Sequence, residues 1–446
     1  MAVSSNSAKS RISRKPLAMP ESGANIASVV DHLFRSSAGQ MVSYLTRVLG
    51  PAHLDLAEEA VQDALAKALQ TWPFSGIPAN PPGWLLHVAR NRALDLVRHR
   101  GVVLQKTSEV VAELSRPRFE PPLELPEALR DDELCMIFLA CNPALPRDSR
   151  VALSLKAVSG FSVKEIARAF LCDPATVAQR LVRAKRQIRE QGFSFELPPS
   201  HELGKSLDSV LEVIYLLFNE GYAAHEGDDL VRHDLCSEAL RLALLVADSP
   251  VSQPKAHALV SLLAFQGARL AARVDDNGEL VLLQDQDRSK WDSRLIALGA
   301  RRLAMSAEGE ELSQFHVQAA IASIHAQATD PSTTDWEAIL DLYDDLMTLN
   351  PSSVVALNRV VALGKVHGPQ SALDELTAIQ NDPALRDYYL LPSTRASLLA
   401  ETGEFSQAAN HFEAALRRPC SEPERRFLTR RMQECRDQAL RLPKPS

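Results

Sequence analysis

The chain has 446 residues, 46% of them hydrophobic, which is enough for two or more domains with their own cores and excludes one small module. Its formal net charge of −7 argues against a protein that simply coats nucleic acid. That charge is unevenly spread. Residues 1–193 hold 25 basic and 19 acidic side chains, whereas the remainder holds 24 and 37, so a basic part precedes an acidic one.

Cysteine usage and hydropathy narrow the class of protein. The six cysteines form no CxxC pair and no ligand-like group with histidine, so we expect neither a zinc site nor a disulfide framework. Apolar runs such as the one at 242–247 are far below the roughly 20 residues that cross a bilayer. We expect a cytoplasmic protein with no cofactor and no membrane contact, beginning with a disordered basic tail at 1–23.

The chain is predicted to be all-α, because apolar residues recur at three and four positions almost throughout. Prolines between 116 and 129 predict an extended linker, and those near 198 predict a second break. The predicted order is a helical block at 24–100, a linker at 101–129, a second block at 130–192, a linker at 193–203 and a helical region at 204–446.

In the first block, a helix at 54–70 has one apolar face, made of Ala57, Val61, Ala64 and Ala68. Glu58, Glu59, Gln62 and Asp63 therefore point elsewhere. They form a candidate docking surface for a basic partner, the alternative being an ordinary solvated face.

Aromatic and basic residues follow in the same block. Trp72 and Phe74 lead through a proline- and glycine-rich loop at 75–83 into a helix from Trp84 to Arg100, which carries several arginines. Aromatic rings beside arginines suit unstacked bases, although Trp72 and Trp84 fit a core equally well.

The second block carries a helix-turn-helix pattern. Ser162 and Glu165 form a capping box, and Asp173 with Pro174 starts the next helix. That helix has an apolar stripe of Val177, Leu181, Ala184 and Ile188 and a polar stripe of Thr176, Gln179, Arg180, Arg183 and Arg186. One buried face and one face of Gln and Arg suit the DNA major groove; a merely solvated basic helix is the alternative.

Together the two blocks resemble bacterial sigma-70 factors of the extracytoplasmic-function group. GPAHLDLAEEAVQDALAKAL and PPGWLLHVARNRALDLVRHR resemble their region two, and LPRDSRVALSLKAVSGFSVKEIARAFLCDPATVAQRLVRAKRQIRE resembles their region four. The resemblance implies transcription initiation: binding of core RNA polymerase through its β′ clamp helices and β flap, and recognition of two elements of promoter DNA.

The resemblance also implies roles by position. It assigns Glu58, Glu59, Gln62 and Asp63 to the β′ clamp helices, although this family more usually has an aspartate beside the acidic pair. It assigns Trp84, Arg90, Asn91, Asp95 and Arg98 to the minus-ten element and its melting, and Thr176, Gln179, Arg180, Arg183, Lys185 and Arg186 to the minus-thirty-five element.

The acidic part has repeats. Residues 403–416 have the glycine, alanine and aromatic spacing of a tetratricopeptide hairpin, and a looser unit spans 350–379. Segments 211–222, 280–291 and 318–325 resemble the sigma subgroup with a long tetratricopeptide-like extension. Such arrays present a binding surface, so we expect an interaction or regulatory domain with a protein or peptide ligand. A short extended segment is expected at 278–283.

Two alternatives remain. An acidic and histidine-containing stretch at 220–234 fixes no coordination geometry, so we do not expect an enzyme, and Asp285, Asp287, Arg288 and Trp291 are better explained as an ion pair or turn network. The leading hypothesis is a sigma factor regulated by its C-terminal helical domain. The other is a stand-alone helix-turn-helix regulator with a tetratricopeptide-like sensor domain.

Overall fold

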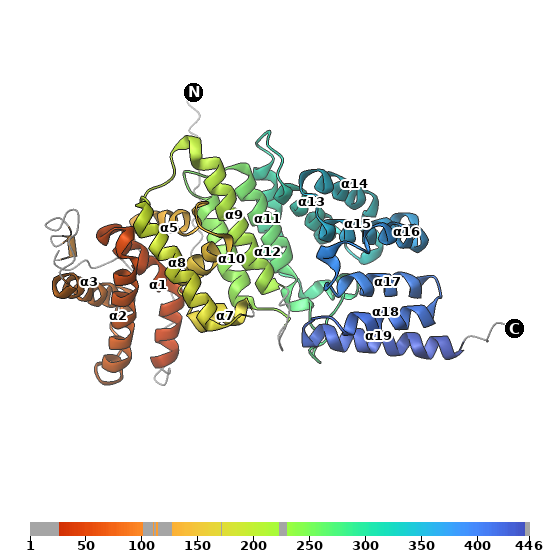
Figure 1. Ribbon diagram of the computed structural model, residues 1–446, viewed down its shortest axis with the longest axis horizontal. Coiled ribbons are helices and arrows are strands. Elements are labelled where there is room, and N and C mark those ends of the chain that lie inside the picture. The colour runs from red at the N-terminus through yellow and green to blue at the C-terminus, as the bar shows by residue number, and fades with distance from the viewer. Residues whose placement is uncertain are drawn as a thin grey trace, which may run out of the picture.

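The computed structural model describes residues 26–100, 110, 113–114, 127–170, 172–222 and 230–441, and only the backbone of 26–36, 100 and 127–128. Within these ranges every regular element is a helix, which confirms the predicted all-α fold (Figure 1). The segment expected to be extended at 278–283 contributes one isolated β-bridge, from Leu280 to Val274. The predicted tail at 1–23 and most of the linker at 101–129 lie outside the described residues. No described helix is long and apolar enough to cross a membrane.

The first block is a bundle of α1 (Ile26–Leu49), α2 (Leu54–Ser75) and α3 (Pro81–Arg100). Gly50 and Gly76, with φ of 87° and 78°, let the chain leave α1 and α2 in a conformation that favours glycine. The predicted apolar face of α2 is at most 1% exposed. Trp72 is also 1% exposed and meets Trp84 edge to face at 5.4 Å, so Trp72 belongs to the core.

The second block contains α5 (Glu127–Ala140), α6 (Arg147–Leu153), one π turn (Ser154–Val158), α7 (Val163–Ala169) and α8 (Pro174–Gln191). The predicted capping box is present, because Glu165 N–H donates to Ser162 Oγ and Ser162 N–H donates to the Glu165 carboxylate. Asp173 accepts from the Ala175 amide at the start of α8. The helix-turn-helix is thus confirmed, with both helix starts where the sequence predicts them.

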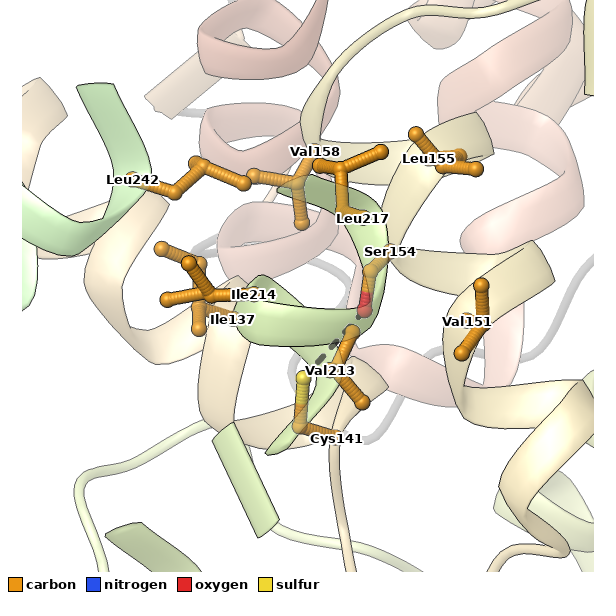
Figure 2. Close-up of a pocket in the computed structure, with 10 residues that line it drawn as sticks. All are labelled: Ile137, Cys141, Val151, Ser154, Leu155, Val158, Val213, Ile214, Leu217 and Leu242. Atoms are coloured by element: carbon orange, nitrogen blue, oxygen red, sulfur yellow. Dashed lines mark hydrogen bonds between the residues drawn. The ribbon is translucent and has the colours of Figure 1, made fainter. Parts of the chain in front are cut away.

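The extension packs directly on the second block through α9 (Ser200–Tyr222) and α10 (His233–Ala247). Figure 2 shows side chains of α5, the π turn, α9 and α10 pointing at one another, among them Ile137, Val158, Leu217 and Leu242. The space left between them is only about 10 Å³, and Cys141 and Ser154 lie in hydrogen-bond contact at 3.2 Å beside it. The second block and the extension therefore share one core.

Helix pairs continue to the C-terminus, away from the first block (Figure 1). They are α11 (Pro254–Ala268), α12 (Ser293–Ser306), α13 (Gln314–Gln327), α14 (Trp336–Leu349), α15 (Ser353–His367), α16 (Pro369–Ile379), α17 (Leu390–Glu401), α18 (Phe405–Leu416) and α19 (Glu422–Arg441). The pair α15–α16 corresponds to the predicted looser unit at 350–379. The predicted hairpin at 403–416 forms α18 alone, and its partner is α17, which precedes the predicted range. Ala372, Ala408 and Ala415 are fully buried in these helices, which allows the close helix contact that these repeats need.

Candidate nucleic-acid interface

Helix α8 divides into a buried and an exposed face, as its sequence predicts. Its apolar stripe is at most 5% exposed, while Gln179, Arg183 and Arg186 face solvent. The preceding α7 sets its orientation, because the capping box and Asp173 fix where both helices begin. Arg186 pairs with Glu190 one turn further along α8 at 3.4 Å, and both side chains of this pair are exposed. A helix held in this way, with guanidinium and amide groups exposed, has the geometry to enter a major groove.

Two residues of this exposed face are apolar, and the sequence reasoning missed them. Val182 is 66% exposed and Ala178 is also exposed, one turn apart on the face that carries Gln179 and Arg183. Apolar side chains in a groove contact the methyl group of thymine. The signal was present, since Ala178 and Val182 are spaced i, i+4 outside the apolar stripe.

Two basic members of the predicted set are engaged inside the protein. Arg180 pairs with Asp148 of α6 at 2.7 Å. Lys185 is 14% exposed, and its ammonium lies 2.7 Å from Asp55 and 2.8 Å from Glu58. Burial lowers the pKa of Lys185, but Glu58 and Asp55 outweigh that effect, so its pKa lies above the ordinary value. Thr176 is partly exposed.

The four predicted polymerase-binding residues of α2 do not form one open surface. Glu58 is 8% exposed and faces Lys185 of α8, while Asp63 pairs with Arg92 of α3 at 2.6 Å. Gln62 is exposed and Glu59 is partly exposed. The sequence reasoning missed Asp55, which extends the acidic face by one turn and could have been found from its i, i+3 spacing to Glu58.

The aromatic-basic region of α3 divides in a similar way. Asn91, Asp95 and Arg98 are exposed, and Trp84 is partly exposed. Arg90 is instead 5% exposed and donates a hydrogen bond to the Glu113 carbonyl oxygen, so in this conformation it is not presented to DNA.

Phe74 lies beside this region and was not in the predicted set. It is 92% exposed, in the last turn of α2, just before the loop that leads into α3. A solvated aromatic ring is a candidate stacking surface for an unpaired base.

The two candidate polar clusters of the extension have different outcomes. Part of the 220–234 stretch lies outside the described residues. Asp287 caps a short turn by accepting from the Ser289 amide, and Arg288 lies over the Trp291 ring at 4.6 Å while donating to the carbonyl oxygens of His325 and Ala328. The turn-network interpretation is therefore confirmed. In the described part of the chain no group of His, Cys, Asp and Glu has an arrangement that would hold a metal ion.

Comparison with known families places three matches along the chain. Residues 33–102 match the family described as sigma-70 region 2, and residues 135–188 match sigma-70 region 4. Residues 206–307, the first part of the extension, match a family of unknown function, DUF6596.

Individual relatives agree with these matches. An uncharacterized protein of Rhizobium meliloti is 40% identical over 369 residues, which cover 82% of this chain and 86% of that protein. The ECF RNA polymerase sigma factor SigE of Mycolicibacterium smegmatis is 27% identical over 36% of this chain and 60% of its own length. The ECF RNA polymerase sigma factor EcfG of Rhodopseudomonas palustris is 29% identical over 30% of this chain and 70% of its own length. No solved structure matches.

Proposed function

Because the chain belongs to the extracytoplasmic-function group of the sigma-70 family, we propose that it binds core RNA polymerase, recognises minus-thirty-five and minus-ten promoter elements and is regulated by its C-terminal helical domain. The observation that carries this proposal is the helix-turn-helix, whose second helix exposes Gln179, Arg183 and Arg186 on one face, where they can reach bases. A sigma factor of this family is an initiation factor, and we propose no catalytic residue and no cofactor.

For the minus-thirty-five element we assign base contacts to Gln179, Arg183 and Arg186. Arg180 and Lys185, which now pair with carboxylates, would reach phosphates or bases after those pairs open. Thr176, at the N-terminal end of α8, would contact the backbone of the same site.

For the minus-ten element we assign the exposed edge of α3, with Asn91, Asp95 and Arg98, together with the partly exposed Trp84. Arg90 would act by holding the segment at Glu113 against α3, since its guanidinium is buried there. We place the stacking of an unpaired base on this side of the first block because Trp84 is partly exposed there on the helix that carries Arg98.

For polymerase we propose that α2 meets the β′ clamp helices through Glu58, Glu59, Gln62 and Asp63, and that the second block meets the β flap. Gln62 offers the cleanest test, because Glu58 pairs with Lys185 and Asp63 pairs with Arg92. Gln62→Lys should weaken core binding without disturbing an internal pair, whereas a stand-alone helix-turn-helix regulator would be indifferent to it.

Regulation by the extension is supported by the core that it shares with the second block. A peptide or protein ligand of the α15–α18 hairpins would be the input. Truncation before α9 tests this poorly, because it would expose Val158, Ile137 and neighbouring apolar side chains that α9 covers, so point variants are needed.

The deciding experiment is reconstituted transcription with core polymerase and the full chain. Start sites are mapped on a genomic library, and the recovered promoters are tested singly. The proposal requires specific initiation that Arg183→Ala abolishes or redirects. Operator binding without core, together with no initiation on any template, would favour the regulator alternative.

A further inference from the structure

The first and second blocks fit together at a contact that only glycine permits. Gly39 of α1 lies against the π turn. A β-carbon added to Gly39 would be 1.6 Å from the carbonyl oxygen of Val158 and 2.6 Å from the carbonyl carbon of Val158. Both are backbone atoms, which cannot move aside as a flexible side chain would. Glycine is unfavourable inside a helix, so its presence here marks a contact that depends on close approach.

A second contact joins the two surfaces assigned above to polymerase and DNA. Lys185 of α8 pairs with Asp55 and Glu58 of α2, and Arg189 lies 3.3 Å from Asp55. While this contact persists, Glu58 is covered and Lys185 is neutralised. Neither side chain can serve its external partner until α2 and α8 separate.

A third contact brings in the extension. Glu133 of α5 is 1% exposed and accepts two hydrogen bonds, from Gln40 of α1 at 3.1 Å and from Arg241 of α10 at 2.7 Å. Arg241 also pairs with Glu238 of α10 at 2.8 Å. One buried carboxylate thus joins the first block, the second block and the extension.

The two donors of Glu133 depend on each other. A buried carboxylate is unfavourable unless hydrogen bonds and a cation compensate it, so Arg241 is what allows Glu133 to stay buried beside Gln40. Arg47 of α1 adds a pair with Asp132 at 2.8 Å on the same side. A movement of α10 that withdrew Arg241 would therefore weaken the packing of α1 against α5.

We propose that Glu133 is a positioning residue through which the extension holds the two sigma domains in a closed packing, and that this packing must open before polymerase and promoter are bound. The proposal rests on the proposed function and adds its regulation. A ligand of the extension acts, in this scheme, by shifting α10 and releasing Arg241 from Glu133.

The first test is Gly39→Ala in the full chain, with Gly204→Ala as its matched control. Both change a helical glycine, but nothing lies within 4 Å of a β-carbon at Gly204. Hydrogen exchange of amides in α1, α2, the π turn and α8 measures opening, and anisotropy of the labelled chain measures affinity for core polymerase.

Gly39→Ala should speed exchange on both sides of the contact and tighten core binding by about tenfold, because apparent affinity is reduced by the fraction that is closed. Gly204→Ala should match the wild type. Unchanged exchange in Gly39→Ala, or faster exchange without tighter core binding while the wild type binds core, would overturn the proposal.

The second test is Arg241→Ala, with Arg302→Ala as its control. Arg302 makes comparably short pairs with Asp248, at 2.6 and 3.0 Å, but entirely within the extension. Arg241→Ala should open the α1–α5 contact and tighten core binding about threefold, and Arg302→Ala should do neither. If the two variants behave alike, Glu133 does not carry the control.

These readouts separate the two proposals. If no variant binds core polymerase but Gly39→Ala and Arg241→Ala still open the contact in exchange, the sigma-factor assignment fails and the positioning role of Glu133 is supported. If the wild type binds core and neither variant alters exchange, the sigma-factor assignment is supported and the positioning role fails.

Discussion

Charge is arranged in opposite ways at two places in this molecule. Between α2 and α8, Lys185 lies against two carboxylates, those of Asp55 and Glu58. At the corner where α9 and α11 end, Arg269 and Arg273 both lie over the Tyr222 ring, at 5.4 and 3.7 Å, and in the described part of the chain neither forms an ion pair. The α2–α8 contact is stabilised by opposite charges. The second place, which we call the arginine corner, is stabilised by arginines that pack on aromatic rings and donate to carbonyl groups.

The difference teaches which contacts can be exchanged. An internal ion pair can be replaced by an external one, because a clamp helix of polymerase or a DNA phosphate offers the same kind of partner. A guanidinium on a tyrosine ring has no such competitor, and Arg273 is 8% exposed. We therefore expect the α2–α8 contact to open when an external partner binds, and the arginine corner to stay closed.

The largest expected effect comes from removing the buried cation of the α2–α8 contact. Lys185→Met leaves the Glu58 carboxylate buried without its cation and should cost about 3–5 kcal/mol of the closed packing. Denaturant unfolding of the full chain, with hydrogen exchange across α2 and α8, measures this loss. The double variant Lys185→Met with Glu58→Met should recover most of it, because no unpaired charge remains; a double variant as weak as the single one would contradict a charge-pair origin.

The second effect tests the arginine corner through pH. Burial, Arg269 and Arg288 lower the pKa of His325 to about 4, below its ordinary 6.5. Between these values the unfolded chain takes up a proton that the folded chain does not. Stability should therefore fall by about 3 kcal/mol as pH drops from 6.5 to 4, and stay constant from this source above 6.5.

The control for that prediction keeps the ring. His325 meets Trp336 edge to face at 5.3 Å, and His325→Phe preserves an aromatic contact while removing the titrating nitrogens. The pH dependence of unfolding in the wild type minus that in His325→Phe isolates the histidine. A difference that is flat between pH 4 and 6.5 would mean that His325 titrates normally.

A third effect compares two arginines of α8. Arg183 is exposed without a described ion pair, whereas Arg180 pairs with Asp148. Arg183→Ala should cost about 1–3 kcal/mol of binding to a recovered promoter and relax base preference at one position. Arg180→Ala should cost less binding free energy. In the wild type, Arg180 must break its pair with Asp148 to reach DNA, and this offsets part of what it gains from the DNA contact. Equal losses of promoter affinity in the two variants, without a change of base preference, would indicate that both arginines contact phosphates.

The smallest effect sharpens the α2–α8 contact itself. Arg189 and Asp55 form a pair in which both side chains are about half exposed, so Arg189→Ala should change stability by no more than about 1 kcal/mol. Unfolding at low and high salt measures it, and the effect should shrink with salt. A loss of stability as large as that of Lys185→Met would show that solvent exposure does not determine how much each ion pair contributes to stability.

Local periodicity was enough to predict α8 and its caps, because the signals for a helix start and an apolar stripe lie within a few residues of each other. The same reasoning could not foresee the partner of Lys185, since Glu58 is 127 residues away and nothing in either helix encodes that register. Arg90 illustrates the same limit: its position on α3 suggested a contact with the minus-ten element, but its guanidinium donates to the carbonyl oxygen of Glu113, 23 residues later.

The core that α9 and α10 share with α5 and the π turn also sets an order of synthesis. Translation proceeds at about 5–20 residues per second, so the DNA-reading block emerges several seconds before α10 can cover Val158 and Ile137. During that interval the block has an incomplete apolar core. A chain that stops short of α10 would keep this apolar surface uncovered, so completion of the core requires synthesis of the extension.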